Sequence, residues 1–241
     1  MLVLLPPSET KQSGGDGPPL RLEALSHPHL TPIRRKLVDE LVALAGDVPA
    51  GLAALGLSER QHGELERNRA LGSAPTLPAL RRYTGVLYAA LGADSLRPRQ
   101  RNRLAVASAL FGLLGPDDGI PAYRLSAGST MPGLGSVRSV WRPVLGPLLA
   151  AQPDLVVDLR SGAYLVLGPA AGAVTVQIIR VDGHGRRRAV SHHNKAQKGR
   201  LARLLATAPR EASDADDVAR IARRGGLRIE QTAEYTLELI V

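Results

Sequence analysis

A short apolar run that opens directly into a polar, turn-rich segment constrains the fold more than any other feature of this sequence. The run, Leu104–Ala107, has the length and composition of a strand buried on both faces. Residues 112–121 then hold three glycines, two prolines and two aspartates, which are typical of turns. Tyr123 and Arg124 follow. Because ligands of α/β sheets bind where interior strands end, the stretch 104–128 predicts a central strand and a site beside it.

Strand and helix patterns alternate along the rest of the chain. Strands are predicted at 2–5, 155–159, 173–181, 186–190, 227–231 and 235–240. Helices are predicted at 31–45, from 58 to about 71, within 76–91, at 137–149 with an interruption around Pro143 and Pro147, from the segment 191–203 onward, and at 213–224. This order predicts an α/β fold: one compact domain over residues 1–241, with a mixed β-sheet flanked by helices.

The helical segment near the N-terminus also has the outline of a helix-hairpin-helix element. Thr31 before Pro32 predicts a capped helix start, and the spacing of Ser58 and Gln61 predicts a capping box. A leucine-rich hairpin around Gly56 joins the two helices. Such a module grips DNA phosphates with backbone amides, while the simpler reading is an ordinary helical corner.

Composition narrows the classes of function. The chain has no cysteine, which excludes disulfides, thiolate metal sites and thiol-based peroxide reduction. No apolar run approaches the roughly 20 residues that span a bilayer, and Pro6 follows the first strand too soon for a signal peptide. We therefore expect a cytoplasmic protein with no membrane partner. Lys and Arg exceed Asp and Glu by 31 to 22, which favours polyanionic partners, although an Arg-rich composition can also reflect genomic base composition.

Two segments concentrate the positive charge. One carries Arg97, Arg99, Arg101 and Arg103, and the other carries Lys195, Lys198, Arg200 and Arg203 at the start of a helix. Cations at a helix N-terminus oppose the helix dipole, so a bound anion would explain them better than stability does. We expect the two segments to form one basic surface that binds DNA phosphates, the alternative being solvated helix faces. His192 and His193 are adjacent and would point to opposite sides of a strand, so no metal and no cofactor is expected.

Several motifs together resemble the YaaA peroxide-stress family. They occur in the family's order at Met1–Lys11, Tyr83–Tyr88, Ser108–Gly128, Trp141, Val156–Tyr164 and Lys195–Leu201. Two details depart from the family pattern. Other members carry Lys at the position of Glu9, so Lys11 is expected to substitute for that charge, and this chain has one extra residue between Lys195 and Gly199.

The resemblance implies a cytosolic peroxide-stress protein that contains a helix-hairpin-helix element, binds DNA and limits iron-dependent damage. It also directs attention to polar residues that follow the predicted strands, namely Ser8, Glu9, Lys11, Ser108, Asp118, Tyr123, Arg124, Asp158, Ser161, Tyr164, Lys195 and Lys198. These residues would suit an enzyme pocket for a nucleobase, a nucleotide or another small anionic substrate, which is the alternative function.

The residues alone do not decide between binding protein and enzyme. The common hydrolase, nucleotide-binding and metalloprotease motifs are absent from the sequence. For Tyr123 and Arg124 an ordinary structural role is also open, with Tyr123 packed in the core and Arg124 paired with Asp117 or Asp118. The site interpretation instead expects at least one of them to line a concave pocket that Lys195 or Lys198 also reaches.

Overall fold

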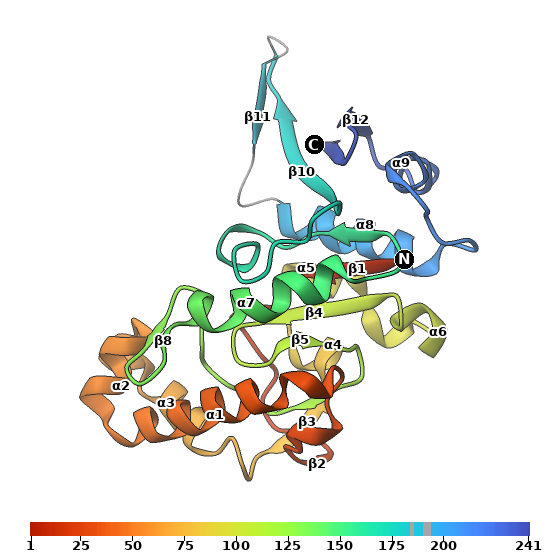
Figure 1. The fold of residues 1–241 in the computed structure, drawn as a ribbon. Coiled ribbons are helices and arrows are strands. Elements are labelled where there is room, and N and C mark those ends of the chain that lie inside the picture. The colour runs from red at the N-terminus through yellow and green to blue at the C-terminus, as the bar shows by residue number, and fades with distance from the viewer. Residues whose placement is uncertain (184–185, 190–193) are drawn as a thin grey trace.

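A mixed β-sheet runs through the centre of the molecule (Figure 1). The computed structural model describes residues 1–183, 186–189 and 194–241. Within these residues the sheet has eight strands, in the order β12-β13-β10-β9-β1-β4-β5 with β11 beside β10. Their bounds are β1 (Leu2–Leu5), β4 (Leu104–Ser108), β5 (Gly112–Leu114), β9 (Val156–Asp158), β10 (Val174–Val181), β11 (Arg187–Ala189), β12 (Ile229–Ala233) and β13 (Thr236–Ile240). The predicted α/β fold with a mixed sheet is confirmed.

The strands that lead into the polar loops are parallel neighbours. β1 lies between β9 and β4, with Leu4 in register with Asp158 on one side and Ala105 on the other. Every residue of β4 is buried, as the apolar run predicts for a strand covered on both faces. Because parallel strands end at the same edge of a sheet, the loops after β1, β4 and β9 leave the sheet together.

Helices cover both faces of these central strands. Figure 1 shows α7 (Val137–Ala150) in front of them, and α5 (Val86–Leu91) with α8 (Asn194–Thr207) behind them. Below the sheet, α1 (Thr31–Gly46) packs against α2 (Val48–Leu55) and α3 (Gly63–Arg69). The remaining helices are α4 (Ala79–Arg82), α6 (Pro98–Arg101) and α9 (Ala215–Arg224). Short pairings β2 (Gly17–Pro19)–β3 (Pro75–Pro78)–β6 (Gly119–Ile120) and β7 (Thr130–Met131)–β8 (Gly135–Ser136) tie the loops to the domain.

The loop after β4 is fixed by one close contact with α7. Trp141 is fully buried, and its indole Nε1 donates to the carbonyl oxygen of Ala109 at 2.7 Å. Gly112 has φ +75°, and a Cβ built on it would lie 2.6 Å from the Trp141 ring. Both the left-handed backbone and the approach of the indole therefore require glycine at this position.

The prediction of a single helix within residues 76–91 is wrong. The segment forms β3, α4 and α5 instead. Tyr83 is extended, and Gly85 adopts φ +98°, a conformation that ends any continuous helix. The break lets Tyr83 pair with Lys11 in an isolated antiparallel bridge, which ties this segment to the loop after β1.

Two smaller expectations also differ from the structure. The helix α7 is continuous, with Pro143 and Pro147 inside it. Both prolines are exposed and lie one turn apart, so the carbonyls that lose a helical donor face water. Thr31 does not cap α1, because its hydroxyl lies 3.4 Å from the carbonyl oxygen of Leu22. The Ser58 capping box is confirmed: the Gln61 side chain accepts from the Ser58 amide at 3.0 Å.

Candidate functional site

A buried lysine lies where the loops after β1 and β4 meet. Lys11 keeps 9% of its surface exposed, and its Nζ donates to the carbonyl oxygens of Ser8 and Glu9 at 3.1 and 3.2 Å. The amine also lies over the ring of Tyr123, 4.3 Å from its centroid, and 5.5 Å from that of Tyr83. Burial, followed by the nearby Arg124 guanidinium, lowers the pKa of Lys11 to about 7. This amine can therefore exchange a proton near neutral pH.

A chain of hydroxyl groups lies beneath the lysine. The phenolic oxygen of Tyr123 lies 2.8 Å from that of Tyr83 and 2.8 Å from the hydroxyl of Ser108, which accepts from the Phe111 amide. Burial raises the pKa of both phenols well above the ordinary value, so they remain protonated. Tyr88 stacks on Tyr83 and donates to the carbonyl oxygen of Pro6 at 2.8 Å. The loop after β1 thus contacts three tyrosines, through the carbonyl oxygen of Pro6 and the amine of Lys11.

Arg124 closes the outer side of this cluster. Its guanidinium contacts the carboxylate of Glu9 at 3.3 Å, and the Glu9 side chain is 76% exposed. The buried Asn68 of α3 fixes the backbone of Arg124, donating to its carbonyl oxygen at 2.9 Å and accepting from its amide at 2.7 Å. Arg124 therefore pairs with Glu9 in place of Asp117 or Asp118. The cluster offers two cationic groups and a phenol chain at the carboxyl edge of the sheet.

Seven of the candidate residues come together in this cluster, and the others do not. Ser8, Glu9, Lys11, Ser108, Tyr123 and Arg124 make the contacts described above, and Tyr164 belongs with them because burial and the neighbouring Tyr123 raise its pKa. Asp118 accepts from the amides of Ser26 and Gly115 at 2.9 Å each and from the Ser26 hydroxyl, so it braces a turn. Ser161 and Lys195 are exposed.

The end of β9 holds a separate buried charge cluster. Asp158 and Arg160 form a two-point ion pair at 2.9 and 2.6 Å, and both side chains are almost fully buried. Lys198 of α8 donates to the carbonyl oxygens of Leu159 and Arg160 at 3.0 and 3.1 Å. Burial lowers the pKa of Lys198, and Asp158 opposes that shift. These contacts anchor α8 to the strand end.

Some cations of the two basic segments bind groups within the protein, and the others are exposed. Arg103 donates to three carbonyl oxygens at the end of α8 and pairs with Glu211, while Arg203 donates to the carbonyls that end α5. Arg101 pairs with Asp117 at 3.0 Å. The exposed cations, none of which has an acidic partner within the described part of the chain, are Arg97, Arg99, Lys195 and Arg200. His192 and His193 lie outside the described residues.

Sequence reasoning missed three side chains that position the site. Asn68 carries no signal that distinguishes it from other polar helix residues. Arg34 is fully buried and donates to the carbonyl oxygens of Phe111 and Leu113, and Arg82 donates to those of Ile120 and Pro75. An arginine in a helix ordinarily faces solvent, so neither could be assigned to the interior from its neighbours in the sequence.

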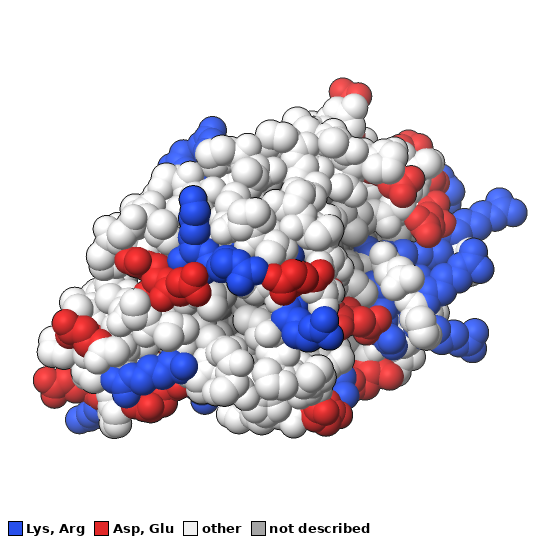
Figure 2. All heavy atoms as spheres, turned by 60° about the horizontal axis from the view of Figure 1, so that its bottom comes forward, with Lys and Arg blue, Asp and Glu red and all other residues white. Residues whose placement is uncertain are grey.

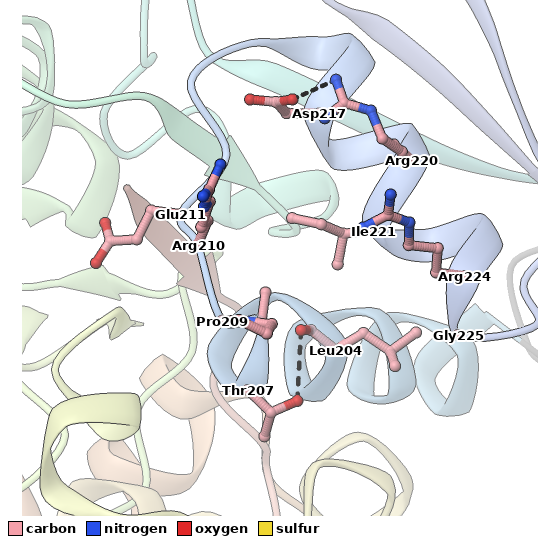
Figure 3. Close-up of a pocket in the computed structure, with 11 residues that line it drawn as sticks. Leu204, Thr207, Pro209, Arg210, Glu211, Asp217, Arg220, Ile221, Arg224 and Gly225 are labelled. Carbon is pink, nitrogen blue, oxygen red and sulfur yellow. Dashed lines mark hydrogen bonds and ion pairs between the residues drawn. The ribbon is translucent and has the colours of Figure 1, made fainter.

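A hollow in the surface lies away from this cluster, between α8 and α9 (Figure 3). Its volume is about 680 Å³, with Leu204, Pro209 and Ile221 on its walls and Arg210 and Arg224 at its rim. None of the seven clustered residues lines this hollow. Among the described residues, no group of three or more His, Asp or Glu side chains is arranged to hold a metal ion, and no helix is long and apolar enough to cross a membrane.

The chain is similar over its whole length to proteins of several bacteria. It is 49% identical to a UPF0246 protein of Corynebacterium efficiens and 45% identical to one of Corynebacterium glutamicum, and each alignment covers all of both chains. A UPF0246 protein of Streptomyces coelicolor is 45% identical over 86% of this chain and 84% of its own length. The family model for the peroxide stress protein YaaA matches residues 1–233. The chain therefore belongs to the YaaA peroxide-stress protein family.

Proposed function

We propose that this protein acts in the response to peroxide stress by binding DNA through its phosphates and limiting iron-dependent damage there. The family's description supports the peroxide setting. Because the chain has no cysteine, it cannot reduce peroxide through a thiol, which favours a role in protecting DNA from damage. The proposal requires the protein to share a compartment with DNA, as the expected cytoplasmic location provides.

The observation that carries the proposal is a set of exposed cations without described acidic partners on two neighbouring elements. Arg97 and Arg99 lie on and beside α6, and Arg200 lies on α8. The two helices are in contact, and Arg203 of α8 donates to the hydroxyl of Ser95, two residues before Arg97. Unpaired guanidinium groups on adjacent elements suit successive phosphates of a duplex.

Figure 2 shows basic side chains projecting at the side where Figure 1 places α6 and α9, with acidic side chains among them. The helix-hairpin-helix element remains a prediction. Gly56 makes a left-handed turn after α2, but Arg67 and Arg69 of the following helix are paired with Glu64 and Glu66, so these two arginines are not free to bind phosphates. We therefore place the principal contact on α6 and α8.

The salt dependence of duplex binding tests this proposal. Four phosphate contacts predict a log–log slope of about −3.6 against salt concentration, and replacing Arg97 and Arg99 by Gln should reduce its magnitude by about 1.8. The matched control is Arg35→Gln with Arg186→Gln, since those exposed arginines are paired with Glu23 and Asp182 and the change in net charge is the same. Equal losses in both double variants, or a slope near zero for the wild type, would contradict the proposal.

A second candidate function, an enzyme for a small anionic or nucleobase ligand, is favoured by the cluster around Lys11. Lys11 and Arg124 place two cationic groups beside Tyr123 at the carboxyl edge of parallel strands. A ligand that binds only the folded state at about 100 times its Kd stabilises it by roughly 2.7 kcal/mol. Nucleotides and nucleobases should therefore raise the Tm of the wild type but not of Arg124→Ala, with Arg35→Ala as the matched control. Stabilisation by none of these ligands would count against this function.

A further inference from the structure

The hollow between α8 and α9 has apolar side chains on both of its walls (Figure 3). Leu204 of α8 and Ile221 of α9 are only partly covered by the core, and the exposed Pro209 lies in the segment that joins the two helices. A Cβ built on Gly225 would lie 2.3 Å from the Leu204 side chain, so the end of α9 bounds the hollow directly against that wall. The volume of about 680 Å³ falls within the range of about 300–1,000 Å³ that is typical of small-molecule sites.

The two acidic residues that line the hollow already have partners. Asp217 accepts from the amide and the hydroxyl of Ser213 at 3.0 and 2.8 Å and pairs with Arg220. Glu211 accepts from the α-amino group of Met1. These hydrogen bonds hold the pKa of both carboxyl groups below their usual values, so both groups are ionised and both are engaged by donors of the chain itself.

Two guanidinium groups at the hollow have no such partner. Arg210 and Arg224 are exposed, and within the described part of the chain neither side chain makes a hydrogen bond or an ion pair. The dipole of α9 does not account for Arg224, because Arg223 lies in the same last turn and its Nε donates to the carbonyl oxygen of Ile229 at 3.0 Å. The hollow therefore combines apolar walls with positive charge that no described residue neutralises.

This combination selects the chemistry of an occupant. A guanidinium group binds a carboxylate or a phosphate through two parallel hydrogen bonds. The side chains of Leu204 and Ile221 instead favour an apolar body that removes their surface from water. A bare anion would leave these walls exposed, and a neutral apolar molecule would leave the guanidinium groups unpaired. An occupant that satisfies both has an acidic group joined to one or two rings or to a branched alkyl chain.

We propose that the hollow between α8 and α9 binds a small organic anion with an apolar body. The acidic group pairs with the guanidinium groups of Arg210 and Arg224, and the apolar body lies between Leu204 and Ile221. The residues that line the hollow include neither the cluster around Lys11 nor the exposed cations of α6 and α8. The site is therefore independent of both functions proposed above, and its test does not depend on theirs.

Isothermal titration calorimetry of the whole chain with 1-naphthoate and with 4-methylpentanoate tests the proposal, since one probe has a flat body and the other a branched one. At least one of them should bind with a stoichiometry of one. For 1-naphthoate, acetate lacks the rings and 1-naphthalenemethanol lacks the charge, so each should bind about tenfold more weakly or worse. Failure of both probes to bind at about 1 mM would overturn the proposal, as would equal affinity for either control compound.

Two double variants locate the binding. Arg210→Gln with Arg224→Gln should weaken binding of the probe by about tenfold or more without lowering the Tm, because both side chains are exposed and unpaired. The matched control is Arg138→Gln with Arg142→Gln, which removes the same charge at exposed positions of α7. Equal losses in both double variants would show attraction by net charge alone and overturn the proposal. Tighter binding of 1-naphthyl phosphate than of 1-naphthoate would assign the site to organic phosphates, and weaker binding would assign it to carboxylates.

Discussion

Replacing Lys11 should change how the stability of the protein depends on pH. In the folded chain the pKa of Lys11 is about 7, and in the unfolded chain it returns to about 10.4. Between these values the unfolded state binds more protons, so the free energy of unfolding rises with pH. Below about pH 7 lysine is charged in both states, and the full cost of burying the charge is present. The contribution of Lys11 to the free energy of unfolding therefore increases as pH rises from neutral to alkaline.

The size of the effect follows from the same two pKa values. Between about pH 7 and about pH 9.5, Lys11 contributes an increase of about 3 kcal/mol in the free energy of unfolding. The upper limit of the window is set by Tyr83, Tyr88 and Tyr123, whose pKa values burial raises in the folded state. Above about pH 10 these phenols ionise on unfolding and lower the stability.

Denaturant unfolding of the wild type and Lys11→Met at both pH values measures this contribution. The quantity compared is the change in the free energy of unfolding between the two pH values, for the wild type minus the variant. Titrating groups that do not interact with Lys11, such as Lys198, cancel in this difference. Lys36→Met is the matched control, because Lys36 is exposed and should behave as the wild type does. If Lys11→Met and the wild type respond to pH within about 0.5 kcal/mol of each other, the amine is not desolvated in the folded state, and burial does not lower its pKa.

Three further substitutions test the supports of the site by denaturant unfolding. Gly112→Ala should destabilise the protein by about 2 to 4 kcal/mol, because its Cβ would meet the Trp141 ring at a left-handed position, and Gly183→Ala should cost far less. Asn68→Ala should cost about 2 to 3 kcal/mol, since it leaves both backbone groups of Arg124 without a partner. Asp158→Ala should cost about 3 to 5 kcal/mol, because the Arg160 guanidinium stays buried without its acidic partner. For any of the three variants, a loss in the free energy of unfolding below about 1 kcal/mol would show that the contact is dispensable.

The parts of the fold that the sequence predicts are those governed by local pattern. Apolar runs at 2–5, 104–107 and 155–159 mark strands that are buried on both faces, and these strands are neighbours in the sheet. The hairpin of β12 and β13 and the capped helix α9 also follow from turn residues and charge placement. Each of these features depends on residues close together in the chain.

The parts that could not be predicted depend on contacts between distant residues. The break in the helix expected at 76–91 serves the pairing of Tyr83 with Lys11, which are 72 positions apart. The phenol chain joins Tyr83 to Tyr123, and Asn68 reaches Arg124 across 56 positions. The sequence pattern predicts helices around Tyr83 and Asn68, wrongly for Tyr83, and it contains no information on which loop each side chain will contact.

The interior arginines change what the net charge means for DNA binding. The formal charge of +9 counts every guanidinium equally. Yet Arg34, Arg82 and Arg103 each donate to carbonyl oxygens within the protein. Counterion release requires a cation that reaches a phosphate. The salt dependence of DNA binding should therefore depend on the exposed, unpaired cations of α6 and α8. Replacing an arginine that donates to carbonyl oxygens inside the protein should instead lower the free energy of unfolding.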